Sequence, residues 1–502
     1  MALVKMEYYL SLLLLLSFLW ICIHFLTKSL AARTLPPGPR PFPIVGNILQ
    51  LGNNPPQDFA NLSKTYGPII TVMLGSLTTI VISSAEVAKE IFQKHDQAIS
   101  GRAIPDSLRA HDHHKVSMAW LPVAGPWRNL RKICSVHMFS KKQLDITQYI
   151  RRRKVQELLD YLQEKCDSGS SIDIGQAVFT TTLNSISNTL FSIDLVHHHS
   201  HLSQSFKELA CRVMEDIGNP NFADYFPILR FFDPQGSRKR MSGYFDRLFE
   251  IFDGIINERL QTRASSTKNK ETNDVLDSLL NLVEENNNSE FGLGDIRHLI
   301  LDLFFGGIDT TSASVEWTMA ELLRNPEKLA KAKNELRGLL GKDWMEKAEE
   351  FDISNFPYLQ AVVKESLRLH PPGPLVAPHK TESEINIVGF RVPKNAQVFI
   401  NLWAMGRDPK VWPNPTTFMP ERFLERDIDV RDFEFMPFGA GRRICPGLPL
   451  ASRVVPLVLA SLIYTFDWKL ADGLKPEDVD MTEKFCFSLH KAKPLLVVPI
   501  QV

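Results

Sequence analysis

Cys445 is the residue whose surroundings best suit a metal ligand. Residues 438–447 read Phe-Gly-Ala-Gly-Arg-Arg-Ile-Cys-Pro-Gly, and residues 448–462 are an apolar, helix-compatible run that contains Pro456. Gly441 permits a tight turn because it has no Cβ. A cysteine at a helix N-terminus has its thiolate favoured, and the thiolate is the form that binds metal. Taken alone, a glycine-rich loop with a cysteine favours a buried cysteine over a metal ligand.

The same loop does not fit a nucleotide-binding motif. Gly439 and Gly441 match two glycines of the dinucleotide fingerprint, but Ile444 occupies the position of the third. No strand–helix–strand pattern surrounds the loop. The chain has 6 cysteines, with no CxxC pair and no Cys/His spacing that suits zinc. The sequence therefore gives no reason to expect a nucleotide site at this loop or a zinc site among the cysteines.

A second candidate lies inside a helix that the pattern predicts over residues 295–324. Gly306 and Gly307 stand in its middle, where each glycine costs about 1 kcal/mol relative to alanine. This cost indicates that something approaches the helix backbone closely. Asp309 and Thr310 follow directly. By themselves, Asp309 is an ordinary charged residue of a helix, and Thr310 is a threonine that a helix tolerates.

Two further pairs are spaced so that their side chains share one face of a helix. Glu365 and Arg368 are three residues apart in a predicted helix over residues 358–370, which two prolines end. Trp127 and Arg131 are four residues apart in another predicted helix. Singly, the first pair is a surface ion pair of small value, and Arg131 is a solvated charge.

Taken together, these features are specific. Phe438, Gly441, Arg443, Cys445 and Gly447 match the haem-binding signature of the cytochrome P-450 superfamily, and the chain resembles this superfamily from its proline-rich segment to its C-terminus. The resemblance implies haem b as the cofactor and Cys445 as the sulfur ligand of its iron. At finer grain the chain is similar to plant terpenoid oxidases of the geraniol 8-hydroxylase type, through residues 221–227, 233–236 and 370–374.

The resemblance also implies roles for the other candidates. Asp309 and Thr310 would lie over the distal haem face and manage proton delivery to bound O2. Glu365 and Arg368 would form a buried structural network with Arg422 that holds the cysteine loop. The implied cofactor-binding residues, besides Cys445, are Arg102, Trp127, Arg131, His379, Phe438, Arg443 and Gly447. The implied substrate pocket contains Leu301, Phe305, Gly306, Val376 and Phe487, with residues 103–122 as a variable lid.

The elements that position these residues are expected to form a mainly α fold with small β-sheets. Residues 69–74 and 78–83 are β-rich runs around Gly75-Ser76 and predict a hairpin. Helical periodicity dominates the remainder, and no linker divides the globular part. The predicted division is a membrane anchor over residues 1–33, a proline-rich hinge over 34–45 and a cytochrome P-450 catalytic domain over 46–502.

The N-terminus predicts a single transmembrane helix. Residues 8–26 are almost wholly apolar and long enough to span a bilayer. Lys28 and Arg33 follow this run, so the positive-inside rule places the catalytic domain in the cytosol, at the endoplasmic reticulum membrane. The alternative is a cleaved signal peptide, whose apolar core is typically shorter. The 57 basic and 57 acidic residues cancel and give no global reason to expect nucleic acid.

The resemblance implies a monooxygenase that inserts one oxygen atom from O2 into a hydrophobic small molecule, here a terpenoid. Because the sequence contains no nicotinamide or flavin site, the electrons would come from NADPH through NADPH–cytochrome P-450 reductase, with cytochrome b5 as a second candidate partner. Three alternatives stay open: an oxidase of another plant specialised metabolite (alkaloid, phenolic or xenobiotic), a reductase-independent haem-thiolate isomerase, and a haem protein that carries or senses a gas. The Asp309-Thr310 pair argues against the isomerase. A basic docking face for an acidic partner would contain Arg128, Lys132, Lys141, Lys142 and Arg442.

Overall fold

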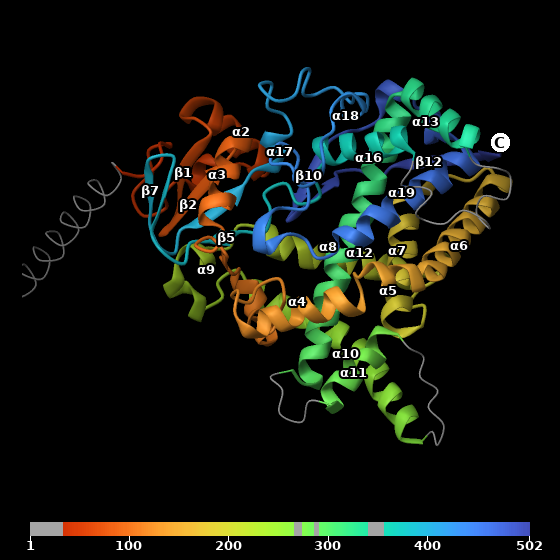
Figure 1. The fold of residues 1–502 in the computed structure, drawn as a ribbon, viewed down its shortest axis with the longest axis horizontal. Coiled ribbons are helices and arrows are strands. Elements are labelled where there is room, and N and C mark those ends of the chain that lie inside the picture. The colour runs from red at the N-terminus through yellow and green to blue at the C-terminus, as the bar shows by residue number, and fades with distance from the viewer. Residues whose placement is uncertain (1–33, 266–273, 286–290, 340–355, 502) are drawn as a thin grey trace, which may run out of the picture.

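The structure is a computed structural model that describes residues 34–265, 274–285, 291–339 and 356–501. Helices dominate this part of the chain, and the strands form small sheets (Figure 1). The predicted mainly α fold with small sheets is confirmed. Residues 1–33 lie outside the described residues, so the anchor helix stays a prediction.

The largest sheet joins segments that are far apart in the sequence. Its strand order is β1 (Ile69–Leu74), β2 (Leu77–Ile82), β8 (Gln397–Ile400), β5 (His379–Lys380) and β3 (Gly101–Arg102). The predicted hairpin is confirmed, because β1 pairs with β2 across a turn in which Gly75 has a φ of 59°. At the other edge Arg102 of β3 pairs in register with His379 of β5. The sheet thus places two basic residues side by side.

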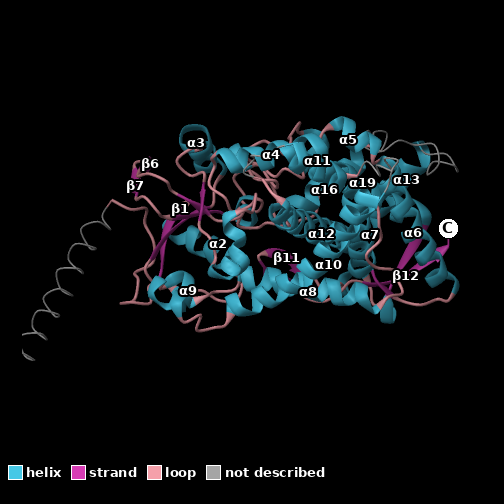
Figure 2. Cartoon of the chain, turned by 90° about the horizontal axis from the view of Figure 1, so that it is seen from below, coloured by secondary structure: helices cyan, strands magenta, loops and turns pink. Residues whose placement is uncertain are grey.

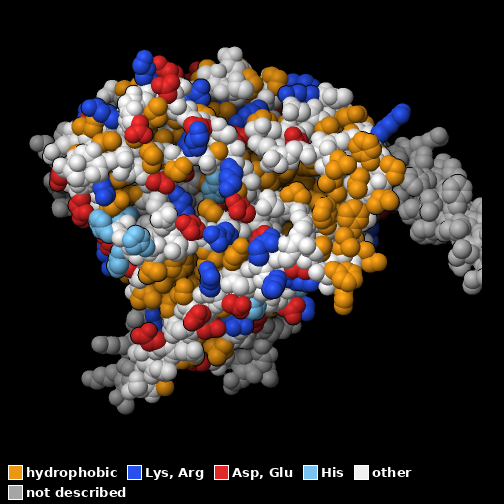
Figure 3. Space-filling view, turned by 180° about the vertical axis from the view of Figure 1, so that it is seen from behind, with side chains coloured by type: hydrophobic (Ala, Val, Ile, Leu, Met, Phe, Trp, Pro, Cys, Tyr) orange, Lys and Arg blue, Asp and Glu red, His pale blue; other side chains and the backbone are white. Residues whose placement is uncertain are grey.

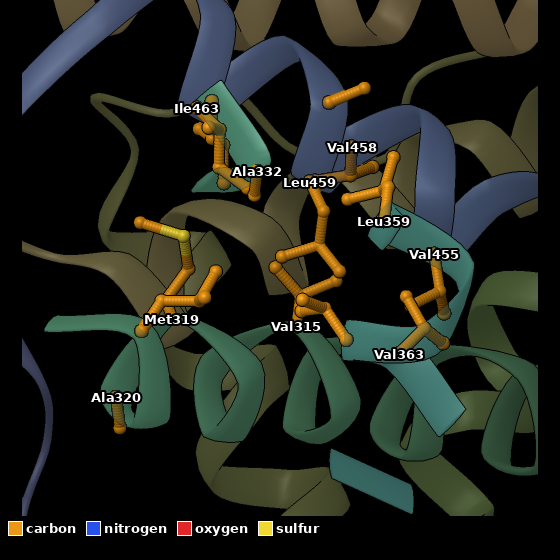
Figure 4. Packing of buried hydrophobic residues seen from close by; sticks show 14 of the residues in the cluster. Val315, Met319, Ala320, Ala332, Leu359, Val363, Val455, Val458, Leu459 and Ile463 are labelled. Carbon is orange, nitrogen blue, oxygen red and sulfur yellow. The ribbon is translucent and has the colours of Figure 1, made fainter. Parts of the chain in front are cut away.

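The helical core is built around α12 (Leu293–Arg324), which covers the predicted helix. It packs against α7 (Ile174–Phe191), α16 (Pro357–Leu369) and α19 (Leu448–Thr465), and Figure 2 shows it surrounded by other helices. Figure 4 shows the contact of three of these helices, where Val315, Leu359 and Leu459 converge. Burying this apolar surface stabilises the fold by roughly 25 cal/mol per Å². Pro456 does not interrupt α19.

The remaining helices and strands surround this core. The helices are α2 (Pro55–Tyr66), α3 (Ala85–His95), α4 (Gly125–His137), α5 (Lys141–Ile146), α6 (Gln148–Asp167), α8 (His201–Gly218), α9 (Phe222–Tyr225), α10 (Ser237–Ser265), α11 (Val275–Glu285), α13 (Pro326–Leu339), α17 (Leu402–Met405) and α18 (Arg422–Glu425). Shorter 3-10 turns include η2 (Asp106–Lys115), η3 (Pro227–Phe231) and η4 (Gly441–Arg443). The other strands are β4 (Ile172–Asp173), β6 (Ile385–Ile387), β7 (Phe390–Val392), β9 (Phe466–Leu470), β10 (Glu483–Cys486), β11 (Ser488–Lys491) and β12 (Leu496–Gln501).

Within the described ranges, α19 is the one helix long and apolar enough to cross a membrane. More than half of it is buried inside the protein, and its apolar side chains belong to the main hydrophobic cluster. Length and composition alone do not separate a core helix from a membrane span. The burial of α19 identifies it as a core helix.

Candidate active site around Cys445

Cys445 lies in a closed loop between η4 and the first turn of α19. Its backbone N–H donates to the carbonyl of Phe438 at 2.9 Å. Gly439 and Gly441 have φ values of 71° and 66°, which a residue with a Cβ rarely adopts. The tight turn predicted at Gly441 is therefore present, and it aims the sulfur toward the start of the helix.

Asp96, which follows α3, fixes this loop from outside. Its carboxylate accepts the backbone N–H of Arg442 at 3.0 Å and pairs with the guanidinium of the same residue at 3.0 Å. A Cβ on Gly441 would collide with this carboxylate, so glycine is required for space as well as for conformation. No motif in the sequence connects Asp96 with Arg442, and sequence reasoning missed it.

The environment of the sulfur acts in two opposing directions. Burial raises the pKa of the Cys445 thiol, while the backbone N–H groups of Gly447 and Leu448 and the charge of Arg131 lower it. The helix N-terminus thus favours the thiolate as expected, but burial outweighs it in the protein alone. A metal cation at the sulfur reverses this balance, because a coordinating thiol is deprotonated.

Gly447 has no steric partner in the protein. A Cβ at this position would meet only the sulfur of Cys445, at an ordinary contact distance of 3.7 Å. Its φ of −80° is open to any residue. No neighbouring protein group therefore requires glycine here, which leaves room beside the sulfur for a bound group.

Four basic side chains gather near this loop and form a basic cluster, Arg102, Arg131, His379 and Arg443. Their protein partners are backbone carbonyls: Arg102 donates to Ala119 and Ala377, Arg131 to Ile444, His379 to Ile99 and Arg443 to Ser100 and Leu121. Among the residues that the structure describes, none of the arginines of the cluster has a carboxylate within ion-pair distance. The three arginines are therefore a concentration of positive charge with no paired carboxylate in the described part of the chain, and only a longer-range effect of Glu382 acts on Arg443.

Burial and mutual repulsion lower the pKa values of the members of this cluster. Burial, followed by the charge of Arg443, lowers the pKa of Arg102 to about 9. Burial, followed by the charge of Arg131, lowers the pKa of Arg443 to about 10. In addition, Nη1 of Arg443 is buried and has no hydrogen-bond partner in the described part of the chain. Buried charges are normally paired, so the cluster fits the two carboxylates at the edge of a haem.

The ring N–H groups of Trp127 and His379 already donate to backbone carbonyls. The indole N–H of Trp127 donates to the carbonyl of Met118 at 3.1 Å, and the guanidinium groups of Arg131 and Arg443 lie 5.5 and 5.1 Å from the centre of its ring. His379 donates Nδ1–H to Ile99 at 2.9 Å, and burial, then the charge of Arg102, lowers its pKa to about 3. As a neutral ring, His379 needs an additional proton before it can donate to a carboxylate.

The two glycines of α12 face different surroundings. A Cβ on Gly307 would collide with Ile186 of α7, so this glycine permits the close packing of the two helices. A Cβ on Gly306 would meet no atom within 4 Å, and this glycine is exposed although it lies in the middle of a core helix. Thr310 donates its hydroxyl to the carbonyl of Gly306 at 2.8 Å. Gly306 and Thr310 therefore border an open space.

Asp309 and Thr310 are neighbours in sequence but do not face each other. The carboxylate of Asp309 is 2% exposed and contacts Ser488 and His490 of β11. Successive residues of a helix point about 100° apart, which explains the divergence. The expected acid–alcohol pair is thus split between two environments, and sequence reasoning did not identify Ser488 or His490.

A model of the cytochrome P450 family matches residues 36–498. The chain belongs to this family. It is therefore a monooxygenase, and the family implies a haem iron as cofactor.

The similar relatives are plant enzymes that match along nearly their whole length. The chain is 52% identical to cytochrome P450 76T24 of Catharanthus roseus, over 96% of this chain and 97% of that protein. It is 48% identical to geraniol 8-hydroxylase of Swertia mussotii, over 96% of each. It is 48% identical to ferruginol synthase of Salvia fruticosa, over 93% of this chain and 95% of that protein.

In this cytochrome P450, Glu365, Arg368 and Arg422 meet in a fully buried network. Arg368 donates to both carboxylate oxygens of Glu365, at 2.7 and 2.8 Å, and Arg422 donates to one of them at 3.0 Å. The backbone N–H of Met419 adds a fourth bond at 2.7 Å. The second arginine comes from α18, far along the chain from α16. The three residues named from the sequence are thus brought together.

A cavity of ≈ 340 Å³ leads toward the basic cluster of this cytochrome P450. Val376 and Phe487 line it together with Arg102, and both have positive φ values, of 53° and 66°. Phe305 lines a separate small apolar cavity between α7, α8 and α12. Leu301 was predicted to face the pocket, but it is fully buried in a hydrophobic cluster and lines neither cavity. On α12 it lies on the core-facing side, which spacing alone does not distinguish from the pocket side.

The predicted lid, residues 103–122, is tied to α12 at its inner end. Asp302 of α12 accepts from Ser117 at 2.7 Å and from the backbone N–H of Met118 at 2.7 Å. His113 lies 3.3 Å from Asp302 and 3.0 Å from His298, both on α12. The lid is therefore fastened by polar contacts that its sequence, rich in His and Asp, did not reveal.

Proposed function

We propose that this cytochrome P450 hydroxylates a terpenoid with one oxygen atom from O2, using haem b with Cys445 as the sulfur ligand of its iron. The observation that carries the proposal is the basic cluster, whose arginines have no paired carboxylate among the described residues, beside a cysteine at a helix N-terminus. A cofactor with a metal centre and two carboxylates satisfies both features at once. When bound, the haem supplies the activation of O2 that no side chain provides.

The residues of the chain would hold this cofactor through its edge and its face. Arg102, Arg131 and Arg443 offer guanidinium donors to the carboxylates, and charge-assisted bonds of this kind are strong. Phe438, whose carbonyl accepts the N–H of Cys445, and Gly447, which leaves room beside the sulfur, would border the face of the cofactor. A carboxylate next to His379 would raise its pKa, because an opposite charge favours the protonated ring.

The distal side would belong to α12. Gly306 leaves its surface open, and Thr310, whose O–H is directed to the carbonyl of Gly306, keeps lone pairs available to accept a hydrogen bond. Replacing Thr310 by Ala is expected to uncouple reduction from hydroxylation, so that peroxide replaces product. Unaltered product per NADPH consumed would argue against its role in proton delivery.

A terpenoid substrate is supported by the walls of the cavity and by the relatives. Leu375, Val376, Phe485 and Phe487 make the cavity largely apolar, which suits a molecule with few hydrogen-bonding groups. Two of the relatives are named geraniol 8-hydroxylase and ferruginol synthase. Regiochemistry would follow from the orientation that these side chains impose.

A reductase would dock on a basic face around the cysteine loop. Arg128, Lys132, Lys141, Lys142 and Arg442 are all exposed and lie on α4, α5 and η4. An acidic partner would be steered to this face by electrostatic attraction. The proposed partner is a membrane-bound NADPH–cytochrome P450 reductase, with cytochrome b5 as a second donor.

The apolar exterior supports attachment to the endoplasmic reticulum membrane. Figure 3 shows a broad apolar area on one side of the molecule. Segments 42–49 and 222–232 both hydrogen-bond to the turn between β1 and β2, through Val45 and Tyr225. Their exposed large apolar residues are Phe42, Ile44, Leu49, Phe222, Ile228, Phe231 and Phe232. Large exposed apolar patches mark contact with a membrane or a partner.

The decisive experiment is a substrate panel in microsomes that contain the chain and a plant reductase. Terpenoids, alkaloids and phenolics are supplied with NADPH, and products are identified by mass spectrometry. Hydroxylated terpenoids that require both reductase and NADPH are expected. Products formed without the reductase would instead indicate an isomerase, and a preference for alkaloids or phenolics would reject the terpenoid class.

A further inference from the structure

Asp309 has two polar partners that the proposed proton delivery does not explain. Its carboxylate accepts the hydroxyl hydrogen of Ser488 and lies 3.2 Å from Nε2 of His490. Ser488 Oγ and His490 Nε2 are themselves 3.1 Å apart. The three side chains therefore form a closed triangle, which we call the distal triad.

The hairpin of β10 and β11 positions two members of the triad. Ser488 and His490 are two residues apart on β11, so they point to the same side of the strand. The intervening Leu489 is held by its backbone, which donates to Pro372 at 3.0 Å and accepts from Trp317 at 3.1 Å. Phe487, at the turn of the same hairpin, lines the large cavity. One hairpin thus serves both the cavity and the triad.

The partners of the triad hold one another in charged form. Burial acts to raise the pKa of Asp309, but the charge and hydrogen bond of His490, the hydrogen bond of Ser488 and the charge of Lys207 together outweigh it, and the pKa is lowered. Burial acts to lower the pKa of His490, but Asp309 outweighs it, and the pKa is raised above the usual 6.5. Both shifts, together with the 3.2 Å separation, favour the ionic form of the pair.

Other charged groups also act on the triad. Glu316 of α12 raises the pKa of His490, and Lys207 of α8 lowers it. Lys207 pairs with Asp173 at 3.5 Å, and both side chains are about a quarter exposed. Cys211 of α8 also lies in the field of Asp309, and burial raises its pKa to about 11, so it is neutral near pH 7. The side chain of His490 is itself 18% exposed, so solvent can reach it directly.

We propose that the His490–Asp309 pair stores the proton that Asp309 delivers to the distal side. In this step the N–H bond at Nε2 of His490 breaks and an O–H bond forms on Asp309, which leaves two neutral groups. Because both groups are then neutral, the electrostatic attraction that holds Asp309 against β11 is lost. The cost of keeping two charges buried is removed at the same time. The protonated side chain then turns toward Thr310, and a proton from solvent restores His490. Ser488 is a positioning residue for the carboxylate.

This proposal rests on the proposed role of Asp309 in proton delivery. Three variants distinguish a failure of the proton store at His490 from a failure of that role. His490→Gln keeps a side-chain N–H for Asp309 but removes the stored proton. Ser488→Ala removes one hydrogen bond and leaves the ionic pair. Asp309→Asn tests the proposed role itself. Product and peroxide per NADPH are measured across the pH range on both sides of pH 6.5.

In the wild type, the coupling, which is the product formed per NADPH consumed, is expected to fall as pH rises through the pKa of His490. His490→Gln is expected to lower coupling about tenfold, less than the usual range for general acid catalysis because Asp309 stays in place, and to abolish this pH step. Ser488→Ala is expected to keep the step. If Asp309→Asn uncouples the enzyme and His490→Gln does not, the inference fails while the role of Asp309 stands; if neither uncouples, that role fails.

A second readout does not depend on turnover. The stability that His490 contributes is fully present below its unfolded pKa of 6.5 and is lost as pH rises through its higher folded pKa. Thermal unfolding of the wild type is therefore expected to weaken across this interval, and that of His490→Gln is expected to lack the step. Identical unfolding profiles for the two proteins would contradict an ionic pair.

Discussion

The Glu365 network and the mouth of the large cavity each contain a buried carboxylate, but the two carboxylates differ in the hydrogen bonds that they accept. Glu365 accepts four hydrogen bonds from Arg368, Arg422 and a backbone N–H. Asp106, near the mouth, is also fully buried, yet neither of its oxygens has a hydrogen-bond partner among the described residues. Its nearest cation is Arg109, at 3.5 Å.

This difference matches what each region has to do. A buried carboxylate with every lone pair engaged allows one arrangement of its neighbours and makes the surrounding backbone rigid. Loosely paired charges, such as Asp106, Arg109 and Arg230, can exchange partners when the walls of the cavity move. We therefore expect the region around Glu365 to be more rigid than the entrance of the cavity around Asp106.

The largest expected effect concerns the ligand in the rigid region. Cys445→Ser removes the sulfur but leaves the loop closed by Phe438 and Asp96, so the protein is expected to fold. The red-shifted Soret band of the ferrous carbon monoxide complex should disappear completely. Cys166→Ser, which changes a distant and partly exposed cysteine, serves as the control and should retain the band. A band that survives in Cys445→Ser would refute the ligand assignment.

A matched pair of isosteric variants tests the comparison directly. Glu365→Gln leaves two buried arginines without a counter-charge and is expected to cost roughly 3–5 kcal/mol of stability. Asp106→Asn removes a carboxylate with no hydrogen bond to lose and is expected to cost less than about 1 kcal/mol. Thermal unfolding and the yield of haem-loaded protein measure both. Similar losses in the two variants would show that the regions do not differ in this way.

The sequence predicted local features well. The turn at Gly441, the hairpin around Gly75, the end of α16 before two prolines and the length of α12 all depend on signals within a few residues. Glycine, proline and apolar spacing act through the adjacent backbone, so they can be interpreted without the fold. The helical spacing also placed Glu365 and Arg368 on one face.

Contacts between distant segments could not be predicted from the same signals. Periodicity shows which face of α12 a residue occupies but not what packs against that face, which is why Leu301 was assigned to the pocket and the partners of Asp309 were missed. Asp96 belongs to the same class, because only the folded chain brings it to Arg442. The sequence showed that the lid is rich in His and Asp. It did not show that the lid contacts Asp302, because that contact depends on tertiary packing.

The smallest expected effect is a pH dependence confined to the mouth of the cavity. Burial, partly opposed by a hydrogen bond from the backbone N–H of Asp106, raises the pKa of Asp224 from 3.8 to about 6. The stability that the protonated form provides is fully present below pH 3.8 and is lost as pH rises through about 6. Ionisation of Asp224 should therefore loosen its surroundings near neutral pH, while the Glu365 network is expected to stay unchanged.

Hydrogen exchange measured on either side of this pKa tests that contrast. Residues 222–232, which contain α9 and η3, are expected to exchange faster above about pH 6 than below it, after correction for the intrinsic rate. Residues 357–369, which form α16, should show no such difference. Asp224→Asn cannot ionise, so it is expected to exchange at the slow rate on both sides. A step that persists in this variant would assign the pH dependence to another group and would remove Asp224 as the reason that the entrance is looser than the support of the cofactor.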